Sequence, residues 1–125
     1  CAAGKDAVVT LWGHGTARRE FLHVDDAARA AIMMMESGVT GLYNVGSGDD
    51  LSIRDLAGVV ASVVGYNGPV EWDTSKPDGT PRKLMDSSRL RAKGWAPRIS
   101  LEDGIKSTYE WYLQARDAEM ARLTA

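Results

Sequence analysis

The sequence has almost no cysteine and no long hydrophobic run, and its charges nearly cancel. Cys1 is the only cysteine, which excludes an internal disulfide and a cysteine-based metal site. No apolar stretch approaches the roughly 20 residues that cross a bilayer, and no basic-then-apolar leader opens the chain, so we expect a cytoplasmic protein without a membrane span. The formal net charge of -2 excludes a general attraction to nucleic acid or membranes. Local basic clusters would therefore have to hold any anionic ligand.

The length and composition are those of one small globular domain. The chain has 125 residues, of which 44% are hydrophobic and 26% are charged, so a disordered or collagen-like chain is excluded. We expect a single domain over 1–125, with a polar tail over 115–125 that frays. Because the chain opens on Cys1 and not on methionine, we also expect that a longer polypeptide precedes it.

Strand and helix patterns alternate along the chain. Runs of β-branched or alternating apolar residues predict strands at 8–12, 18–24, 42–45 and 70–72. Apolar residues at helical spacing predict helices at 25–38, 52–65, 86–94 and 100–114. A loop is expected over 73–82, which is rich in proline, glycine and aspartate. The alternation predicts an α/β fold, but strands this few and short indicate that part of the sheet is missing.

Capping residues mark where the predicted helices begin and end. Asp25 is expected to be the N-cap of the first helix. Ser52, with Asp55 three residues later, forms a variant of the capping box for the second. Trp95 follows the glycine that ends the third helix and is expected to fold back on Leu90. In the last helix, residues at helical spacing are expected to face the core: Ile105, Tyr109, Tyr112 and Leu113.

Two sequence motifs carry the functional signal. The first, over 12–26, reads Trp-Gly-His-Gly-Thr-Ala-Arg-Arg-Glu-Phe-Leu-His-Val-Asp-Asp and resembles the opening of the substrate-binding part of extended short-chain dehydrogenases that act on nucleotide sugars. The second, over 75–84, reads Ser-Lys-Pro-Asp-Gly-Thr-Pro-Arg-Lys-Leu and resembles the GDP-L-fucose synthase family in particular. The resemblance covers 8–114. It implies the small C-terminal α/β domain of an extended short-chain dehydrogenase, with short strands and about four helices, without its N-terminal Rossmann half.

The resemblance also implies a GDP-sugar, GDP-4-keto-6-deoxymannose, as ligand. A sugar nucleotide needs a forked cation for its diphosphate, carboxylate acceptors and a flat packing surface. By the resemblance Arg19 would hold the pyrophosphate, Trp12 would pack on the nucleotide or sugar, and Asp78 would accept hydrogen bonds from the ribose or base. Arg82 and Lys83 are further candidates for the same anion. We expect Arg19 and the 75–84 loop to approach the diphosphate from opposite sides of a cleft.

Several assignments have alternatives that the sequence leaves open. Arg19 could be a surface charge, Trp12 could belong to the core, and Asp78 could form a turn with the glycine that follows it. His14 and His23 have no companion ligands at metal-binding spacing, so both are interpreted as hydrogen-bonded structural histidines.

The family's catalytic and cofactor motifs do not occur in this sequence. The family enzyme epimerises and then reduces its substrate with NADPH, and its glycine-rich fingerprint and its tyrosine followed four residues later by lysine lie in the Rossmann half. We therefore expect no cofactor site in this chain, NADP being bound by the full-length family, and no catalysis by the chain alone. The acidic pair Asp25 and Asp26 precedes a helix, which favours capping over catalysis.

The expected partners follow from the missing half. The resemblance implies that 25–35 and 42–45 normally pack on the Rossmann sheet, so in isolation they would expose apolar surface and a strand edge. We predict docking to a Rossmann chain or self-association. Two alternatives remain: a freestanding nucleotide-sugar-binding or assembly module, and a fragment of another nucleotide-sugar epimerase or dehydratase. The 75–84 loop argues against the last.

Overall fold

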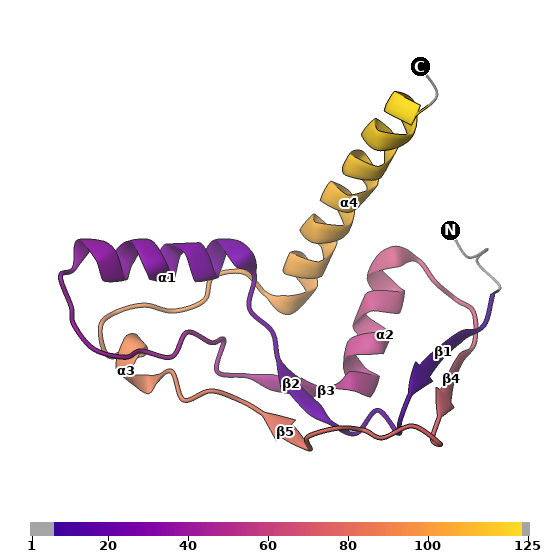
Figure 1. Cartoon of the computed structure of the whole chain (residues 1–125), viewed down its shortest axis with the longest axis horizontal. Helices are drawn as coiled ribbons and strands as arrows, with labels where there is room; N and C mark the ends of the chain where they lie inside the picture. The colour runs from indigo at the N-terminus through magenta and orange to yellow at the C-terminus, as the bar shows by residue number, and fades with distance from the viewer. Residues whose placement is uncertain (1–6, 124–125) are drawn as a thin grey trace.

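A computed structural model describes residues 7–123, which contain four helices and five short strands (Figure 1). In chain order the elements are β1 (Val9–Trp12), β2 (Arg18–Glu20), α1 (Val24–Glu36), β3 (Asp50–Ser52), α2 (Ile53–Val64), β4 (Val70–Asp73), β5 (Arg82–Lys83), α3 (Ser88–Arg91) and α4 (Leu101–Leu123). The predicted α/β class with short strands and about four helices is confirmed. Cys1 and the last two residues of the predicted tail lie outside the described residues.

The strands form two small sheets. In the first, β1 and β4 run parallel, with Val9 opposite Val70. In the second, β2 lies between β3 and β5, antiparallel to β3 and parallel to β5. Arg19 is thereby placed between Leu51 of β3 and Lys83 of β5. The loop predicted over 73–82 corresponds to 74–81, which lies between β4 and β5 and so connects the two sheets.

Two strand predictions need correction. The strand expected over 18–24 ends at residue 20, because its partners β3 and β5 contribute only three and two residues. The strand expected over 42–45 is wrong: within residues 7–123 no strand pairs with this segment. The segment is hydrogen-bonded by a side chain instead: Arg89 donates from Nη1 to the backbone carbonyl of Leu42 at 2.8 Å. A short apolar run becomes a strand only where another strand can bond its backbone.

The helix caps agree with the sequence at α2 and differ at α1. Ser52 Oγ accepts from the backbone N of Asp55 at 3.0 Å and donates to its carboxylate at 2.6 Å, which confirms the capping box. Gly65 ends α2 in the left-handed conformation, with φ 69°. At α1 the N-cap is His23 and not Asp25, two residues earlier than predicted, because the helix begins at Val24. His23 Nδ1 accepts from the backbone N of Asp25 at 3.2 Å.

The last helix, α4, is longer than predicted. It continues to Leu123, beyond the predicted end at Gln114. Alanine, glutamate, arginine and methionine dominate 115–122, and these are strong helix formers. Tyr112, which was expected to face the core, is 51% exposed.

The hydrophobic core is small and the molecule is elongated. Leu90 and Ala30 are fully buried and Trp95 is 4% exposed, and the three pack together as predicted for Trp95 and Leu90. Partly buried apolar side chains from α1 and from the segment before β3 surround this cluster. Helices α1 and α4 extend away from each other (Figure 1). A single buried cluster of this size leaves much apolar surface uncovered.

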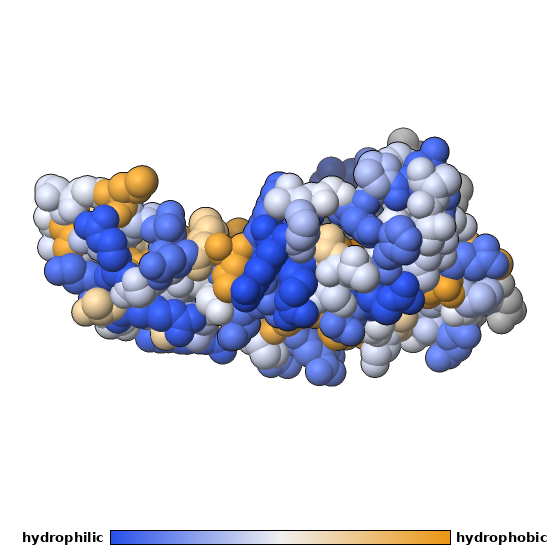
Figure 2. All heavy atoms as spheres, turned by 90° about the horizontal axis from the view of Figure 1, so that it is seen from below, coloured by the Kyte–Doolittle hydropathy of each residue, from blue (hydrophilic) through white to orange (hydrophobic). Residues whose placement is uncertain are grey.

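The exposed area is large for the mass. The chain exposes 8870 Å², whereas a compact monomer of 13.5 kDa is expected to expose about 6,500 Å². Apolar side chains contribute to the excess, among them Met35 at 83%, Leu42 at 80% and Val24 at 71%. The lower face is mostly hydrophilic, with hydrophobic atoms gathered at the α1 end and near the middle (Figure 2). No helix within residues 7–123 is both long and apolar enough to cross a membrane.

Candidate functional site

A tight glycine turn, residues 13–15, connects β1 to β2. Gly13 and Gly15 have φ of 77° and 72°, a conformation that side chains rarely adopt. A Cβ atom on Gly13 would collide with the carboxylate of Asp78, and one on Gly15 would collide with the ring of Trp72. The turn is therefore closely packed by both side chains, and glycine is required at both positions.

The Asp78 carboxylate binds this glycine turn. Its Oδ1 accepts from the backbone N of His14 at 2.6 Å and of Gly15 at 3.2 Å, and its Oδ2 accepts from His14 Nδ1 at 2.8 Å. These hydrogen bonds, above all the one from the His14 backbone, hold the pKa of Asp78 below its usual value. Asp78 thus fastens the 73–82 loop to the β1–β2 connection, and one acceptor position on Oδ2 remains for a ligand.

Helix α2 supports the turn from another side. Arg54 donates from Nη2 to the carbonyl of His14 at 2.6 Å, and its backbone N donates to the carbonyl of Gly15 at 2.9 Å. Its guanidinium also lies 4.5 Å from the centroid of the Trp72 ring. Sequence reasoning did not find Arg54 or Trp72, since neither stands in a motif and only the tertiary fold brings them to the turn.

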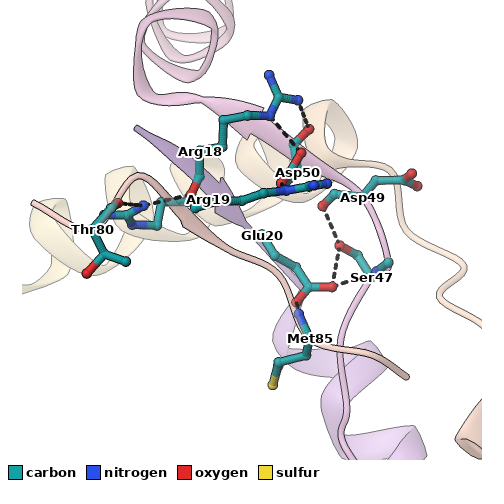
Figure 3. A network of polar contacts seen from close by, with 10 residues as sticks. Arg18, Arg19, Glu20, Ser47, Asp49, Asp50, Thr80 and Met85 are labelled. Carbon is teal, nitrogen blue, oxygen red and sulfur yellow. Dashed lines mark hydrogen bonds and ion pairs between the residues drawn. The ribbon is translucent and has the colours of Figure 1, made fainter. Parts of the chain in front are cut away.

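Arg19 of β2 lies beside the 73–82 loop. Its Nη1 donates to the carbonyl of Thr80 at 2.7 Å and to that of Arg18 at 2.7 Å. Figure 3 shows Arg19 directed toward Thr80, whereas Arg18 is directed toward Asp50. Among the described residues nothing bonds Nε or Nη2 of Arg19, so part of the guanidinium fork remains available. Arg19 and the loop are therefore side by side, and not on opposite sides of a cleft as expected.

The three-stranded sheet separates the basic residues into two groups. Side chains alternate along a strand, and residues paired across strands share a face, so Arg19 and Lys83 lie on one face and Arg18 and Arg82 on the other. Asp50 accepts from Arg18 Nε at 2.8 Å and from Arg82 Nε. The hydrogen bond from Arg82, followed by that from Arg18, holds the pKa of Asp50 below its usual value.

Trp12 stands at the end of β1, where the glycine turn begins. It is 71% exposed, so the alternative that it belongs to the core is wrong. The ammonium of Lys76 lies 5.8 Å from its ring centroid. The indole therefore offers an open flat surface that a base or sugar can cover.

Of the five predicted site residues, four surround the connection between β1 and β2. Trp12 begins this connection, Arg19 follows it, Asp78 fastens it, and Lys83 lies beside Arg19. Arg82 is the exception, because its Nε is bonded to Asp50 on the opposite face of the sheet. This pairing could not be read from the sequence, in which Asp50 has the appearance of an ordinary turn residue.

The glycine turn over 13–15 does not have the geometry of a dinucleotide fingerprint. A dinucleotide fingerprint connects a strand to a helix whose N-terminus faces the phosphates. Here the glycine turn leads from β1 into a second strand, β2, and the side chains of Asp78 and Trp72 fill the space beside it.

Comparison with known proteins shows that the chain is similar to parts of nucleotide-sugar enzymes. A model of the NAD dependent epimerase/dehydratase family matches residues 1–46. GDP-L-fucose synthase 1 of Arabidopsis thaliana is 53% identical over 108 residues, which are 85% of this chain and 33% of that protein. GDP-L-fucose synthase of Escherichia coli is 51% identical over 119 residues, which are 87% of this chain and 37% of that protein. The chain thus spans about a third of the length of the curated relatives that it matches.

Solved structures share the fold. A GDP-6-OMe-4-keto-L-xylo-heptose reductase of Campylobacter jejuni superposes with a TM-score of 0.79 at 39% identity, over 86% of this chain and 34% of that one. UDP-glucose 4-epimerase of Thermotoga maritima, determined with UDP-glucose, superposes with a TM-score of 0.78 at 27% identity, over 86% of this chain and 35% of that one.

The chain is similar to nucleotide-sugar epimerases and reductases of the extended short-chain dehydrogenase/reductase family. Within that family its sequence is similar to GDP-L-fucose synthases, at 49 to 56% identity in plants and 51% in Escherichia coli. The share covered fits the C-terminal part of such proteins, as the two motifs had indicated.

Proposed function

We propose that this chain is the GDP-sugar-binding part of a GDP-L-fucose synthase-like epimerase/reductase and is not catalytic alone. The observation that carries the proposal is the incomplete pairing of Arg19, which keeps free donors beside Lys83 and next to the loop of the second motif. A diphosphate needs such a forked cation together with a second positive charge. The ligand that we propose is GDP-4-keto-6-deoxymannose.

The neighbouring side chains suit the rest of a sugar nucleotide. Trp12 offers its exposed ring to the base or the sugar, and Asp78 keeps one acceptor position for a hydroxyl or amine. Arg82 remains a weaker candidate, since only its outer guanidinium nitrogens are available beyond Asp50. The loop that carries Asp78 is held at both ends, so little conformational entropy is lost when a ligand binds.

The preference for guanine can be tested directly by titration calorimetry. We expect the chain to bind GDP at least about tenfold more tightly than UDP, since a site built to bond a particular base leaves polar groups unpaired with the wrong one. Equal affinities would contradict the GDP assignment and favour a fragment of another nucleotide-sugar epimerase or dehydratase.

Hydride transfer would depend on a cofactor held elsewhere. We propose that NADP binds to a part of the full-length protein outside the described residues, because the glycine turn here does not fit a dinucleotide. The residues of this chain would bind and orient the sugar nucleotide.

The excess surface supports a docking role for α1. The exposed area exceeds that of a compact monomer by about 2,300 Å², which is more than the roughly 800 Å² that each partner of a standard interface buries. On α1 the apolar side chains of Val24, Ile32 and Met35 are all more than half exposed. We propose that a Rossmann domain covers this face in the complete protein, and that copies of the chain associate when that domain is absent.

Analytical ultracentrifugation tests the association. The chain is expected to form dimers or larger species as its concentration rises, and Met35→Glu should shift the distribution toward monomer because it places a charge in the apolar interface. The control Gln114→Glu adds the same charge to an exposed position on α4. A monomer at every concentration would contradict the proposal and favour a freestanding binding module.

A further inference from the structure

We propose that His14 is a positioning residue of the nucleotide site: its imidazole holds the Asp78 carboxylate in place and so keeps the loop beside Arg19 in the conformation that receives a diphosphate. The inference rests on the proposed GDP-sugar function. His14 is not among the residues that the family resemblance assigns to the ligand, and it acts through Asp78 and not on the ligand itself.

The loop after β4 is fastened at three successive points to the β1–β2 connection and to β2 itself. Asp78 binds the glycine turn, Thr80 accepts from Arg19 Nη1 at 2.7 Å, and Pro81 accepts from the backbone N of Arg18 at 2.7 Å. Displacement of Asp78 would therefore loosen the loop at Thr80, whose carbonyl group positions the Arg19 guanidinium. The first attachment point is thus coupled to the second.

Only one bond at that first point depends on the side chain of residue 14. The two bonds to Asp78 Oδ1 come from backbone nitrogens, which any residue would supply. The bond to Oδ2 comes from His14 Nδ1 at 2.8 Å. An ionised carboxylate accepts only, so Nδ1 must carry the proton in this contact. Among the described residues Oδ2 has no other hydrogen-bond partner.

The Asp78 carboxylate is a negative charge beside the proposed site of an anionic diphosphate, so its orientation affects binding of that anion. A carboxylate oxygen released from His14 would be free to turn toward Arg19, where it would compete with the diphosphate for the guanidinium and repel it. By bonding Oδ2, His14 keeps the acidic group directed at the turn. The histidine thereby leaves the donors of Arg19 to the ligand.

Because His14 is exposed, its substitution tests the positioning role and not a contribution to core packing. Its side chain is 59% exposed, whereas the Asp78 side chain is 27% exposed. Replacement of an exposed ring removes little buried surface, so the fold should tolerate substitution at this position. Asparagine can present its amide nitrogen near the position of Nδ1, but the longer glutamine side chain cannot do so without a change of rotamer.

Titration of the whole chain with GDP tests the inference. We expect His14→Ala and His14→Gln to weaken GDP binding about tenfold, and His14→Asn to remain within about threefold of the unchanged chain, since a hydrogen bond to a charged group has this magnitude. In an Asp78→Asn background His14→Ala should cause almost no further loss, because the charge that His14 controls is gone. Thermal unfolding of each variant checks that the fold persists.

The outcomes distinguish this inference from the proposed function. The positioning role is overturned if His14→Ala leaves the GDP affinity unchanged. It is also overturned if His14→Ala causes the same loss of affinity in the Asp78→Asn background as in the unchanged chain. In both cases GDP binding itself stands. A loss in His14→Asn as large as in His14→Ala also overturns it. If the unchanged chain does not bind GDP, the proposed function fails and the inference fails with it.

Discussion

Replacement of Arg19 by glutamine is expected to weaken GDP binding by about 100-fold, because a charge-assisted, bidentate contact with the diphosphate is lost. The structure leaves Nε and Nη2 of Arg19 free for this contact while Nη1 is bonded to Thr80. Lysine at this position should recover only part of the affinity, since an ammonium keeps the charge but not the planar fork. Calorimetric titration of both variants with GDP measures the difference.

The matched control for this experiment is Arg116→Gln on α4. Arg116 is an exposed arginine whose partner is the neighbouring Asp117 at 2.8 Å, so its removal changes the net charge equally without touching the site. A similar loss of affinity in Arg116→Gln would show that general electrostatic attraction holds the nucleotide. GDP affinity unchanged in Arg19→Gln would remove the central residue of the proposed site.

Removal of the Asp26 carboxylate is expected to lower the free energy of unfolding by about 3 to 5 kcal/mol, because breaking a buried charge pair leaves its partners without compensation. Asp26 is fully buried at the start of α1. Its Oδ2 accepts from the backbone N of Arg98 at 2.9 Å and of Ile99 at 3.0 Å, and its Oδ1 accepts from Arg29 at 2.5 Å. In Asp26→Ala these three donors lose this acceptor, and α1 loses two of its hydrogen bonds to the segment before α4.

Asp25 supplies an internal control for the same measurement. It precedes Asp26 in the first turn of α1, and its side chain is 74% exposed. Urea denaturation should therefore show Asp25→Ala within about 1 kcal/mol of the unchanged chain. Equal effects of the two substitutions would indicate that the helix dipole, and not the buried bonds, accounts for the acidic pair.

The pH dependence of stability provides a second readout for Asp26. Burial raises the pKa of this carboxyl, but the hydrogen bonds from Ile99, Arg98 and Arg29 together outweigh it, and the net pKa is lowered. A lowered pKa means that the folded state binds the proton less readily than the unfolded state. The stabilisation is therefore complete above the unfolded pKa of about 3.9 and is lost as the pH falls through the folded pKa. Asp26→Asn should flatten this part of the profile, and an unchanged acid transition would contradict the assignment.

Predictions that depended on local sequence agree best with the structure. Ser52 and Asp55 form their capping box because both partners lie within one helical turn. Trp95 packs near Leu90 for a similar reason, since only the end of α3 separates them. The strand expected over 42–45 failed because a strand needs a partner, and pairing depends on distant parts of the chain.

The candidate site shows the same difference between features that local sequence predicts and contacts that the tertiary fold decides. The motifs pointed to Arg19, Asp78 and Lys83, and the structure brings these residues to one connection. Local sequence could not show that Arg82 is bonded to Asp50, or that His14 contacts a residue 64 positions away. Such contacts follow from sheet register and loop path, which are set by the packing of whole elements.

The sequence by itself determined the similarity to nucleotide-sugar enzymes and the approximate positions of the four helices, and it predicted which residues hold a nucleotide diphosphate. These properties reside in side-chain types and in spacings of a few residues, where local hydrogen bonds decide the outcome. Only the tertiary structure decided which of those charges remain free for a ligand. Each cation can be neutralised by any acidic group that the fold brings within reach, and the register of β2 between β3 and β5 assigns Asp50 to Arg18 and Arg82 while it leaves Arg19 and Lys83 on the other face.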